Sequence, residues 1–240
     1  MSFKQFLWVL GLLLTATLAS ATTGIKVATY IPPKAKILMP LVQFETKKYF
    51  PEFNYPEYMP ALIEHESCIS LTHSRCWDPR SELNTKRERG VGLGQITKAF
   101  TATGAIRFDA LTENKNKYRE ELSELTWNNV RERPDLQIRT LVLMTKDKYN
   151  LLYNVTNPFE RLAFADAAYN GGFGGMQKER RYCGLAKDCD PQRWFGNVEL
   201  KCLKNKAILY GLRSACDINR HHVTDVLTVR IPKYLHYFEQ

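Results

Sequence analysis

Three separated segments of the sequence pair a side chain that could move a proton or hold a ligand with residues that could shape a cleft. The first, Ala61-Leu-Ile-Glu-His-Glu66-Ser67, places a glutamate near the end of a short apolar helix. A carboxyl group that packing partly shields from water can keep a proton near neutral pH and act as a general acid. This segment therefore offers Glu66 as a candidate catalytic acid.

The other two segments offer groups that could hold a ligand. Gly90-Val-Gly92-Leu93-Gly94-Gln95-Ile96 sets three glycines beside a glutamine, so that backbone could approach a ligand while the amide donates and accepts hydrogen bonds. Ala167-Ala168-Tyr169-Asn170-Gly171-Gly172 sets an aromatic ring and an amide at a helix end. Each segment alone also fits an ordinary structural role: a surface charge, a plain turn or a helix stop.

Other familiar chemistry is not indicated. His65-Glu66 opens like the zinc-protease pattern H-E-x-x-H, but Ile69 stands where the second histidine ligand is required. His221 and His222 are neighbours that would point apart on a helix, so we expect both on the surface. Neither a G-x-S-x-G elbow nor a P-loop is present. The sequence therefore predicts no metal site and no cofactor.

Taken in this order, the three segments resemble the lytic transglycosylases of the soluble lytic transglycosylase and goose-type-lysozyme-like group. The corresponding segments of that family read Glu-Ser, then Gly-Leu-Met-Gln or a near variant, then Ala-Tyr-Asn-x-Gly. The resemblance covers residues 57 to 240, in which the stretch from Asp135 to Tyr149 looks like the helix before the Ala-Tyr-Asn segment and Pro232-Lys233-Tyr234-Leu235 resembles a late Tyr-Val motif. It implies a mainly α, lysozyme-like fold that acts on the glycan strands of peptidoglycan.

The resemblance also implies roles for single residues. Glu66 would protonate the glycosidic oxygen between N-acetylmuramic acid and N-acetylglucosamine and then, as a carboxylate, accept the proton of the muramyl C6 hydroxyl, which closes a 1,6-anhydro ring. Gly94 departs from the family, in which many members carry Met at this position. The residues implied to hold the sugar or to position the glutamate are Ser67, Gln95, Tyr169, Asn170 and, as a weaker match, Tyr234.

Two alternative functions stay open. A muramidase, which hydrolyses the same bond, usually needs a second carboxylate; Asp78, Glu82 and Asp109 are candidates, and Asp78 is the best placed in the sequence. A cell-wall-binding module without turnover would keep the fold alone. Nucleic-acid binding is not expected, because the basic clusters form no recognised motif and contain no interleaved aromatic residues.

The elements that must position these residues are expected to be helices, with no convincing run of strands. We expect the stretch from Cys68 to Gly90 to be a loop and the C-terminal part to be braced by disulfides. The predicted helices span residues 35–49, 61–67, 91–102, 118–130, 135–152, 158–169, 198–210 and 223–238.

The N-terminus predicts export. One positive charge at Lys4, an apolar run from Phe6 to Leu18 and the small residues Ala19-Ser20-Ala21 form a secretory signal peptide over residues 1–21, with cleavage after Ala21. An uncleaved membrane anchor is the alternative. Once cleaved, the protein would be periplasmic or secreted without stable membrane insertion. Residues 22–56 then form an N-terminal helical extension before the catalytic domain at 57–240.

The cysteines and the charge agree with an exported protein. The chain of 240 residues carries 34 Lys+Arg against 25 Asp+Glu, a formal charge of +9, which favours acidic partners such as cell-wall polymer; no protein partner is indicated. Six cysteines in an exported chain indicate disulfides. Fifteen pairings are possible for six cysteines, and proximity favours Cys68 with Cys76, Cys183 with Cys189 and Cys202 with Cys216.

Overall fold

The protein, seen in a computed structural model that describes residues 29–239, is about half helical. A π-helix continues α8 over Asp225–Arg230, and short 3-10 turns occur at Val130–Glu132, Val198–Leu200 and Leu235–Tyr237. The α-helices are α2 (Pro33–Tyr49), α3 (Tyr58–Ser67), α4 (Ala110–Lys117), α5 (Pro134–Leu151), α6 (Pro158–Gly171), α7 (Phe173–Gly184), α8 (Ala215–Thr224) and α9 (Ile231–Tyr234).

A small antiparallel sheet accompanies the helices, contrary to the sequence-based expectation. Its order is β1-β2-β3-β4, and β5 pairs separately with β6. The predicted loop at 68–90 is confirmed over 68–81 but was wrong where β1 and β2 form, and the predicted helix at 91–102 was wrong. Pairing with neighbouring strands gives these short segments a conformation that their own periodicity does not encode. The strands are β1 (Glu82–Asn84), β2 (Glu88–Val91), β3 (Ile96–Phe100), β4 (Ile106–Asp109), β5 (Ile208–Tyr210) and β6 (Arg213–Ser214).

Most of the predicted helices are confirmed, including 61–67 within α3 and nearly all of 223–238, whereas several other patterns were wrong. The helices expected at 35–49, 135–152 and 158–169 correspond to α2, α5 and α6. The stretch 118–130 instead forms turns, and the expected helix at 198–210 is a 3-10 turn followed by β5. Helix α7 was not predicted, because the segment 173–184 begins with glycines. Its inner face buries Met176 and Cys183 against the core.

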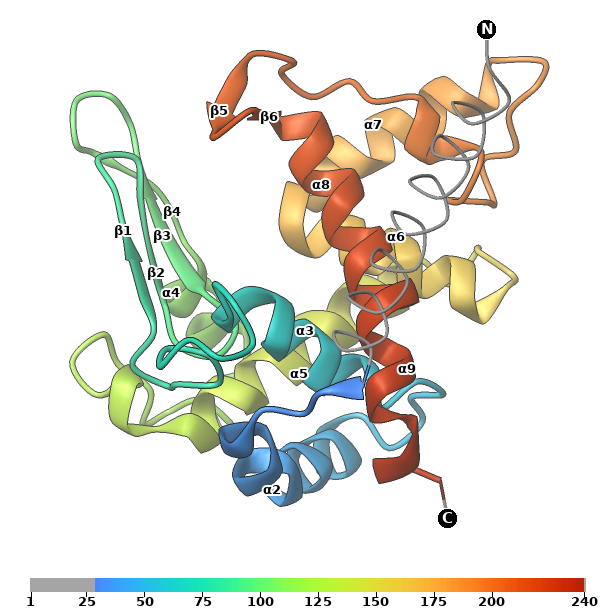
Figure 1. Ribbon diagram of the computed structural model, residues 1–240. Coiled ribbons are helices and arrows are strands. Elements are labelled where there is room, and N and C mark those ends of the chain that lie inside the picture. The colour runs from blue at the N-terminus through green and yellow to red at the C-terminus, as the bar shows by residue number, and fades with distance from the viewer. Residues whose placement is uncertain (1–28, 240) are drawn as a thin grey trace, which may run out of the picture.

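The central helix α3 lies between the base of the sheet and the C-terminal helical segment (Figure 1). Helix α5 packs against both α2 and α6, and α6 also packs against α7 and α8. Most of the buried apolar side chains belong to one core that includes residues from α2, α3, α5, α6 and the C-terminal helices. A second, smaller cluster lies between the sheet, α4 and the start of α5. The fold therefore places α3 where elements distant in sequence converge.

The described part of the N-terminal extension packs into the same core as the rest. Helix α2 buries Ala35, Met39 and Val42, which recur at helical spacing on one face. Its Glu45 carboxylate, 1 % exposed, is bound by the Arg139 guanidinium of α5 at 2.9 Å. Residues 33–49 are thus an integral layer of the fold.

The three predicted disulfides are confirmed. Cys68 joins Cys76, Cys183 joins Cys189, and Cys202 joins Cys216, so two of the three bridges brace the C-terminal part. The predicted signal peptide at 1–21 lies outside the described residues. Among residues 29–239, no helix is both long and apolar enough to cross a bilayer.

Candidate functional site

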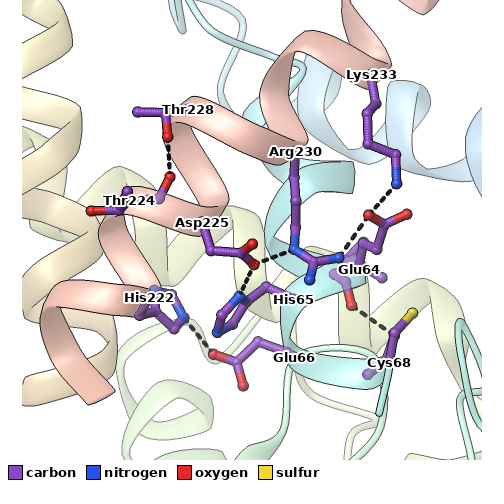
Figure 2. Close-up of polar contacts among 12 residues, drawn as sticks. Glu64, His65, Glu66, Cys68, His222, Thr224, Asp225, Thr228, Arg230 and Lys233 are labelled. Atoms are coloured by element: carbon purple, nitrogen blue, oxygen red, sulfur yellow. Dashed lines mark hydrogen bonds and ion pairs between the residues drawn. The ribbon is translucent and has the colours of Figure 1, made fainter. Parts of the chain in front are cut away.

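Helix α3 carries three consecutive polar side chains, and each of them contacts the C-terminal helical segment (Figure 2). The helix forms because its first two turns are apolar and fully buried, including Tyr58, Leu62 and Ile63. Its last turn, Glu64-His65-Glu66, would leave three polar side chains near the core without partners. α8, the π-helix and α9 supply these partners, so the candidate acid sits at a junction of distant segments.

The Glu66 carboxyl group is mostly buried and is held by one of its oxygens. Its side chain is 15 % exposed, and Oε1 lies 2.8 Å from Nε2 of His222. Among the described residues, the hydrogen bonds of this carboxyl group use Oε1 alone. The sequence did not predict this partner, because the buried imidazole that lies against the acid comes from a distant segment.

His222 is the second residue of a buried chain of polar groups. Its Nδ1 lies 2.7 Å from Oδ2 of Asp166, and the Tyr58 hydroxyl donates to Oδ1 of the same aspartate at 2.7 Å. Burial alone would lower the pKa of His222, but the charges of Asp166 and Glu66 outweigh it and raise the pKa to about 10. His222 is 1 % exposed, so the prediction that both adjacent histidines lie on the surface was wrong for this one.

The glutamate on the opposite side of α3 has a supporting role. Glu64 is fully buried and accepts hydrogen bonds from Arg230 at 2.7 Å, from Lys233 at 2.5 Å and from the Tyr234 hydroxyl at 2.6 Å. Next to it, His65 pairs with Asp225 at 2.6 Å. Tyr234, expected from the resemblance to contact the sugar, has 0 % exposure. In this structure it anchors α3 to α9 and does not reach the surface.

Ser67 also lies inside the protein. It is 2 % exposed, its Oγ donates to the Ile63 carbonyl at 2.7 Å, and the Trp77 backbone N–H donates to Oγ at 3.1 Å. The Cys68–Cys76 bridge follows at once. Ser67 and the disulfide together hold the end of α3 and the loop after it, so Ser67 positions the helix end and does not face a ligand.

The glycine-rich segment forms a tight turn beside α5 and α6. Gly92 and Gln95 both adopt positive φ, 82° and 46°, which glycine tolerates well and glutamine seldom adopts. The Gln95 side chain folds back so that Nε2 donates to the Gly92 carbonyl at 3.0 Å. A Cβ atom on Gly94 would lie 2.0 Å from Cδ2 of Leu141. Close packing against α5 therefore leaves no room for a side chain at this position.

Tyr169 connects the glycine-rich turn to His222. Its hydroxyl donates to the Gly94 carbonyl at 2.6 Å, and its ring stacks on the His222 ring with centroids 6.2 Å apart and planes 26° apart. Burial, with the charges of Glu66 and Asp166, raises the pKa of Tyr169 well above its ordinary value. A continuous path of contacts thus runs from Glu66 through His222 and Tyr169 to the turn.

Asn170 marks the open side of this arrangement. Its side chain is exposed, and Oδ1 accepts a hydrogen bond from Asn219 at 3.1 Å. Tyr169 and Asn170 both line a cavity of about 570 Å³ between the sheet, α4 and the junction of α6 with α7. The cavity wall also carries Phe108, Lys148 and Phe173. Burial lowers the pKa of Lys148 to about 8.

The carboxylates considered for a muramidase are all bound elsewhere. Asp78 binds Lys34 at 2.6 Å and caps the turn at Arg80; burial would raise its pKa, but these partners hold the pKa below its ordinary value. Asp109 binds Lys98 at 3.0 Å. Glu82 pairs with Arg89 and Arg131, and its pKa is lowered chiefly by the hydrogen bond from Arg131. Within residues 29–239, no recorded bond links any of the three to Glu66.

Comparisons with known proteins add no assignment. No known protein family, no curated protein and no solved structure matches this chain.

Sequence reasoning missed the polar groups behind Glu66, although a signal for one of them exists. Asp166 stands in Leu162-Ala-Phe-Ala-Asp-Ala-Ala-Tyr169, a helix segment that is otherwise almost entirely apolar. A lone carboxylate in such a segment needs a buried partner. The sequence does not say which residue that partner is, because His222 lies 56 positions away and meets Asp166 only when α6 packs against α8.

Proposed function

We propose that the protein is a peptidoglycan lytic transglycosylase of lysozyme-like fold, with Glu66 as the single catalytic acid and base. The observation that supports this most is the convergence of the three candidate segments. Glu66 binds His222, His222 stacks on Tyr169, and the Tyr169 hydroxyl binds the Gly94 carbonyl. Segments that lie far apart in the sequence thus meet around one mostly buried acid, and Tyr169, two contacts away from it, also lines the cavity.

The reaction needs one carboxyl group and no water. Glu66 gives its proton to the oxygen that links C1 of the muramyl sugar to C4 of the next N-acetylglucosamine, and the bond between C1 and that oxygen breaks. The resulting carboxylate takes the proton of the C6 hydroxyl while O6 bonds to C1, which restores the protonated acid. The nucleophile is tethered to the reacting sugar, so little entropy is lost in bringing it to C1.

The surroundings of Glu66 suit a mechanism without a second carboxylate. The muramidase candidates Asp78, Glu82 and Asp109 are engaged by cationic side chains, and none of them has a recorded contact with Glu66. A retaining glycosidase would need a second carboxyl group within about 5–5.5 Å, and an inverting one within about 6.5–9.5 Å. The buried Asp166 is bound by Tyr58 and His222, which separates it from any sugar.

The setting of this activity is the proposed exported compartment. Three disulfides are typical of proteins that fold in oxidising compartments, and peptidoglycan lies outside the cytoplasmic membrane. The formal charge of +9 would favour binding to an acidic wall polymer.

Mass spectrometry of the soluble fragments released from purified peptidoglycan tests the proposal. Wild-type protein is expected to release fragments with 1,6-anhydromuramyl ends, one water lighter than hydrolysed ends. Glu66→Gln keeps the shape of the side chain but carries no ionisable proton, so we expect it to bind the wall and release nothing. Glu120→Gln, which changes an exposed glutamate on the surface, is the matched control and should behave like wild type.

The alternatives give different results in the same experiment. Fragments with reducing ends would indicate a muramidase, and Asp78→Asn would then be the next variant to measure. A folded protein that binds the wall and releases no fragments would indicate a binding module. Full activity of Glu66→Gln would overturn the assignment of the acid.

A further inference from the structure

Each of the two ring nitrogens of His222 is hydrogen-bonded to a carboxyl group. Nδ1 meets Asp166, which is 0 % exposed, and Nε2 meets Glu66. An ionised carboxylate can only accept hydrogen bonds, so both nitrogens must carry protons when both acids are ionised. The imidazole then donates a hydrogen bond from Nε2 to Oε1 of Glu66 and leaves Oε2 available to carry the proton that is transferred.

The position of the His222 ring is fixed from several directions. The Tyr58 hydroxyl binds the other oxygen of Asp166 and so holds the aspartate that orients the ring. The Tyr169 ring stacks on one side with centroids 6.2 Å apart, and the His65 ring makes an edge contact with centroids 4.3 Å apart. A ring confined in this way fixes Oε1 of Glu66 and, through the rigid carboxyl group, the direction of Oε2.

The charged and titratable groups around His222 come from three packed elements. Helix α3 contributes Glu66, His65 and Tyr58; α6 contributes Asp166 and Tyr169; the π-helix contributes Asp225 through its bond to His65. Two carboxylates contact the ring directly, and the neighbouring His65 is bound to Asp225 at 2.6 Å. The local balance of charge therefore favours a protonated imidazole throughout the neutral range.

We infer that His222 is a positioning residue for Glu66, which holds Oε1 so that Oε2 faces the substrate and whose positive charge stabilises the carboxylate formed once Glu66 has given up its proton. This inference rests on the proposed function. A charge-assisted hydrogen bond in a site shielded from water is among the stronger interactions available to a developing carboxylate. The Asp166–Tyr58 pair behind the ring keeps the imidazole in place while the charge on Glu66 changes.

The test compares two substitutions of His222. His222→Gln retains an amide N–H that can bind Oε1 but has no charge, and His222→Leu removes both. We expect kcat to fall about 10-fold in His222→Gln and about 100-fold in His222→Leu, with KM for solubilised glycan nearly unchanged in both. His221→Gln, on the exposed neighbour in the same helix, should retain wild-type rates.

The pH dependence separates this role from plain structural support. Removing a positive charge beside Glu66 favours the protonated acid, so the alkaline limb of the kcat/KM profile should move to higher pH in both His222 variants. NMR titration of the imidazole in Glu66→Gln, which needs no turnover, should show His222 losing its proton at a lower pH than in wild type, because one of its two carboxylates is absent.

Circular dichroism and urea unfolding establish that the compared variants are folded. Tyr58→Phe, which removes the hydrogen bond from Tyr58 to Asp166, should give a smaller loss of kcat through Asp166.

The possible results distinguish a failure of the proposed function from a failure of the role inferred for His222. Wild-type protein that releases no fragments would overturn the proposed function, and the catalytic use of His222 with it. An active wild type with folded His222 variants of unchanged kcat and unchanged alkaline limb would overturn this inference alone. The same conclusion would follow if kcat fell but neither the pH limb nor the NMR titration moved, because His222 would then support only the fold.

Discussion

The glycine at position 94 gives the sharpest test of how the candidate site is packed. Gly94→Ala adds one methyl group, and that Cβ would lie 2.0 Å from Cδ2 of Leu141 and 2.7 Å from its Cγ and Cδ1. Ordinary contact begins at 3.4 Å, so Leu141 would have to retreat by about 1.4 Å. Leu141 is 0 % exposed, which leaves it no free space. The backbone at Gly94 is not in the positive-φ region, so the expected cost is steric alone.

The expected magnitude follows from the tightness of that contact. Overpacking a core by a methyl group costs about 1–3 kcal/mol, and contact with three atoms of one side chain places Gly94→Ala near the upper end of that range. Leu141→Ala alone leaves a cavity and should cost about 2–5 kcal/mol. In the double variant the new methyl group enters the space that the leucine vacated. We therefore expect the double variant to be more stable than the sum of the single changes implies, by about 2 kcal/mol.

Urea unfolding of the four proteins, followed by circular dichroism, measures the cycle. Gly174→Ala is the control, since a Cβ there meets nothing within 4 Å and the position lies in α7. That substitution should raise the free energy of unfolding slightly, by up to about 1 kcal/mol. The reasoning would be refuted by a Gly94→Ala protein within about 0.5 kcal/mol of wild type, or by single effects that add without coupling.

Two further predictions concern stability. Folding raises the pKa of His222 from 6.5 to about 10, so the stability contributed by its protonated form is complete below pH 6.5 and is lost as pH rises toward 10. Urea unfolding at pH 7, 8 and 9 should show this decline in wild type and less of it in His222→Gln; equal slopes would contradict it. Replacing both Cys202 and Cys216 with serine opens a loop closed across 14 positions and should lower the free energy of unfolding by about 3 kcal/mol. A change below about 1 kcal/mol would mean that the reduced chain keeps that loop ordered.

Features that depend on nearby residues could be predicted from the sequence. Helices α2 and α5 carry buried apolar residues at helical spacing, and α6 is almost entirely apolar and buried from Leu162 to Ala168. In each case the signal lies within a single helix. The three disulfides join cysteines 6, 8 and 14 positions apart, so proximity along the chain selected the pairing. The Glu66 segment, the glycine-rich turn and Tyr169 were identified in the same way, each as a short local motif.

Tertiary structure alone decided the sheet and the surroundings of Glu66. Strands β1 to β4 have three to five residues each, and they gain their conformation from hydrogen bonds to one another, which no single segment encodes. The placement of Tyr234 and Ser67 inside the protein likewise depends on the packing of α9 and of the Trp77 loop against α3. A sequence motif identifies a residue but does not show whether its side chain is buried or exposed.

The chain from Glu66 to Tyr58 shows the physical reason most clearly. Glu66 and Tyr58 lie on α3, Asp166 on α6 and His222 on α8. The only sign of a buried charge in the sequence is a lone polar residue within an otherwise apolar helix. The group that compensates this cost is set by which helices pack together, because hydrogen bonds act over about 3 Å in space whatever the separation along the chain. The sequence thus determined which residue could act as the acid, and the packing of α3, α6 and α8 determined which groups hold it.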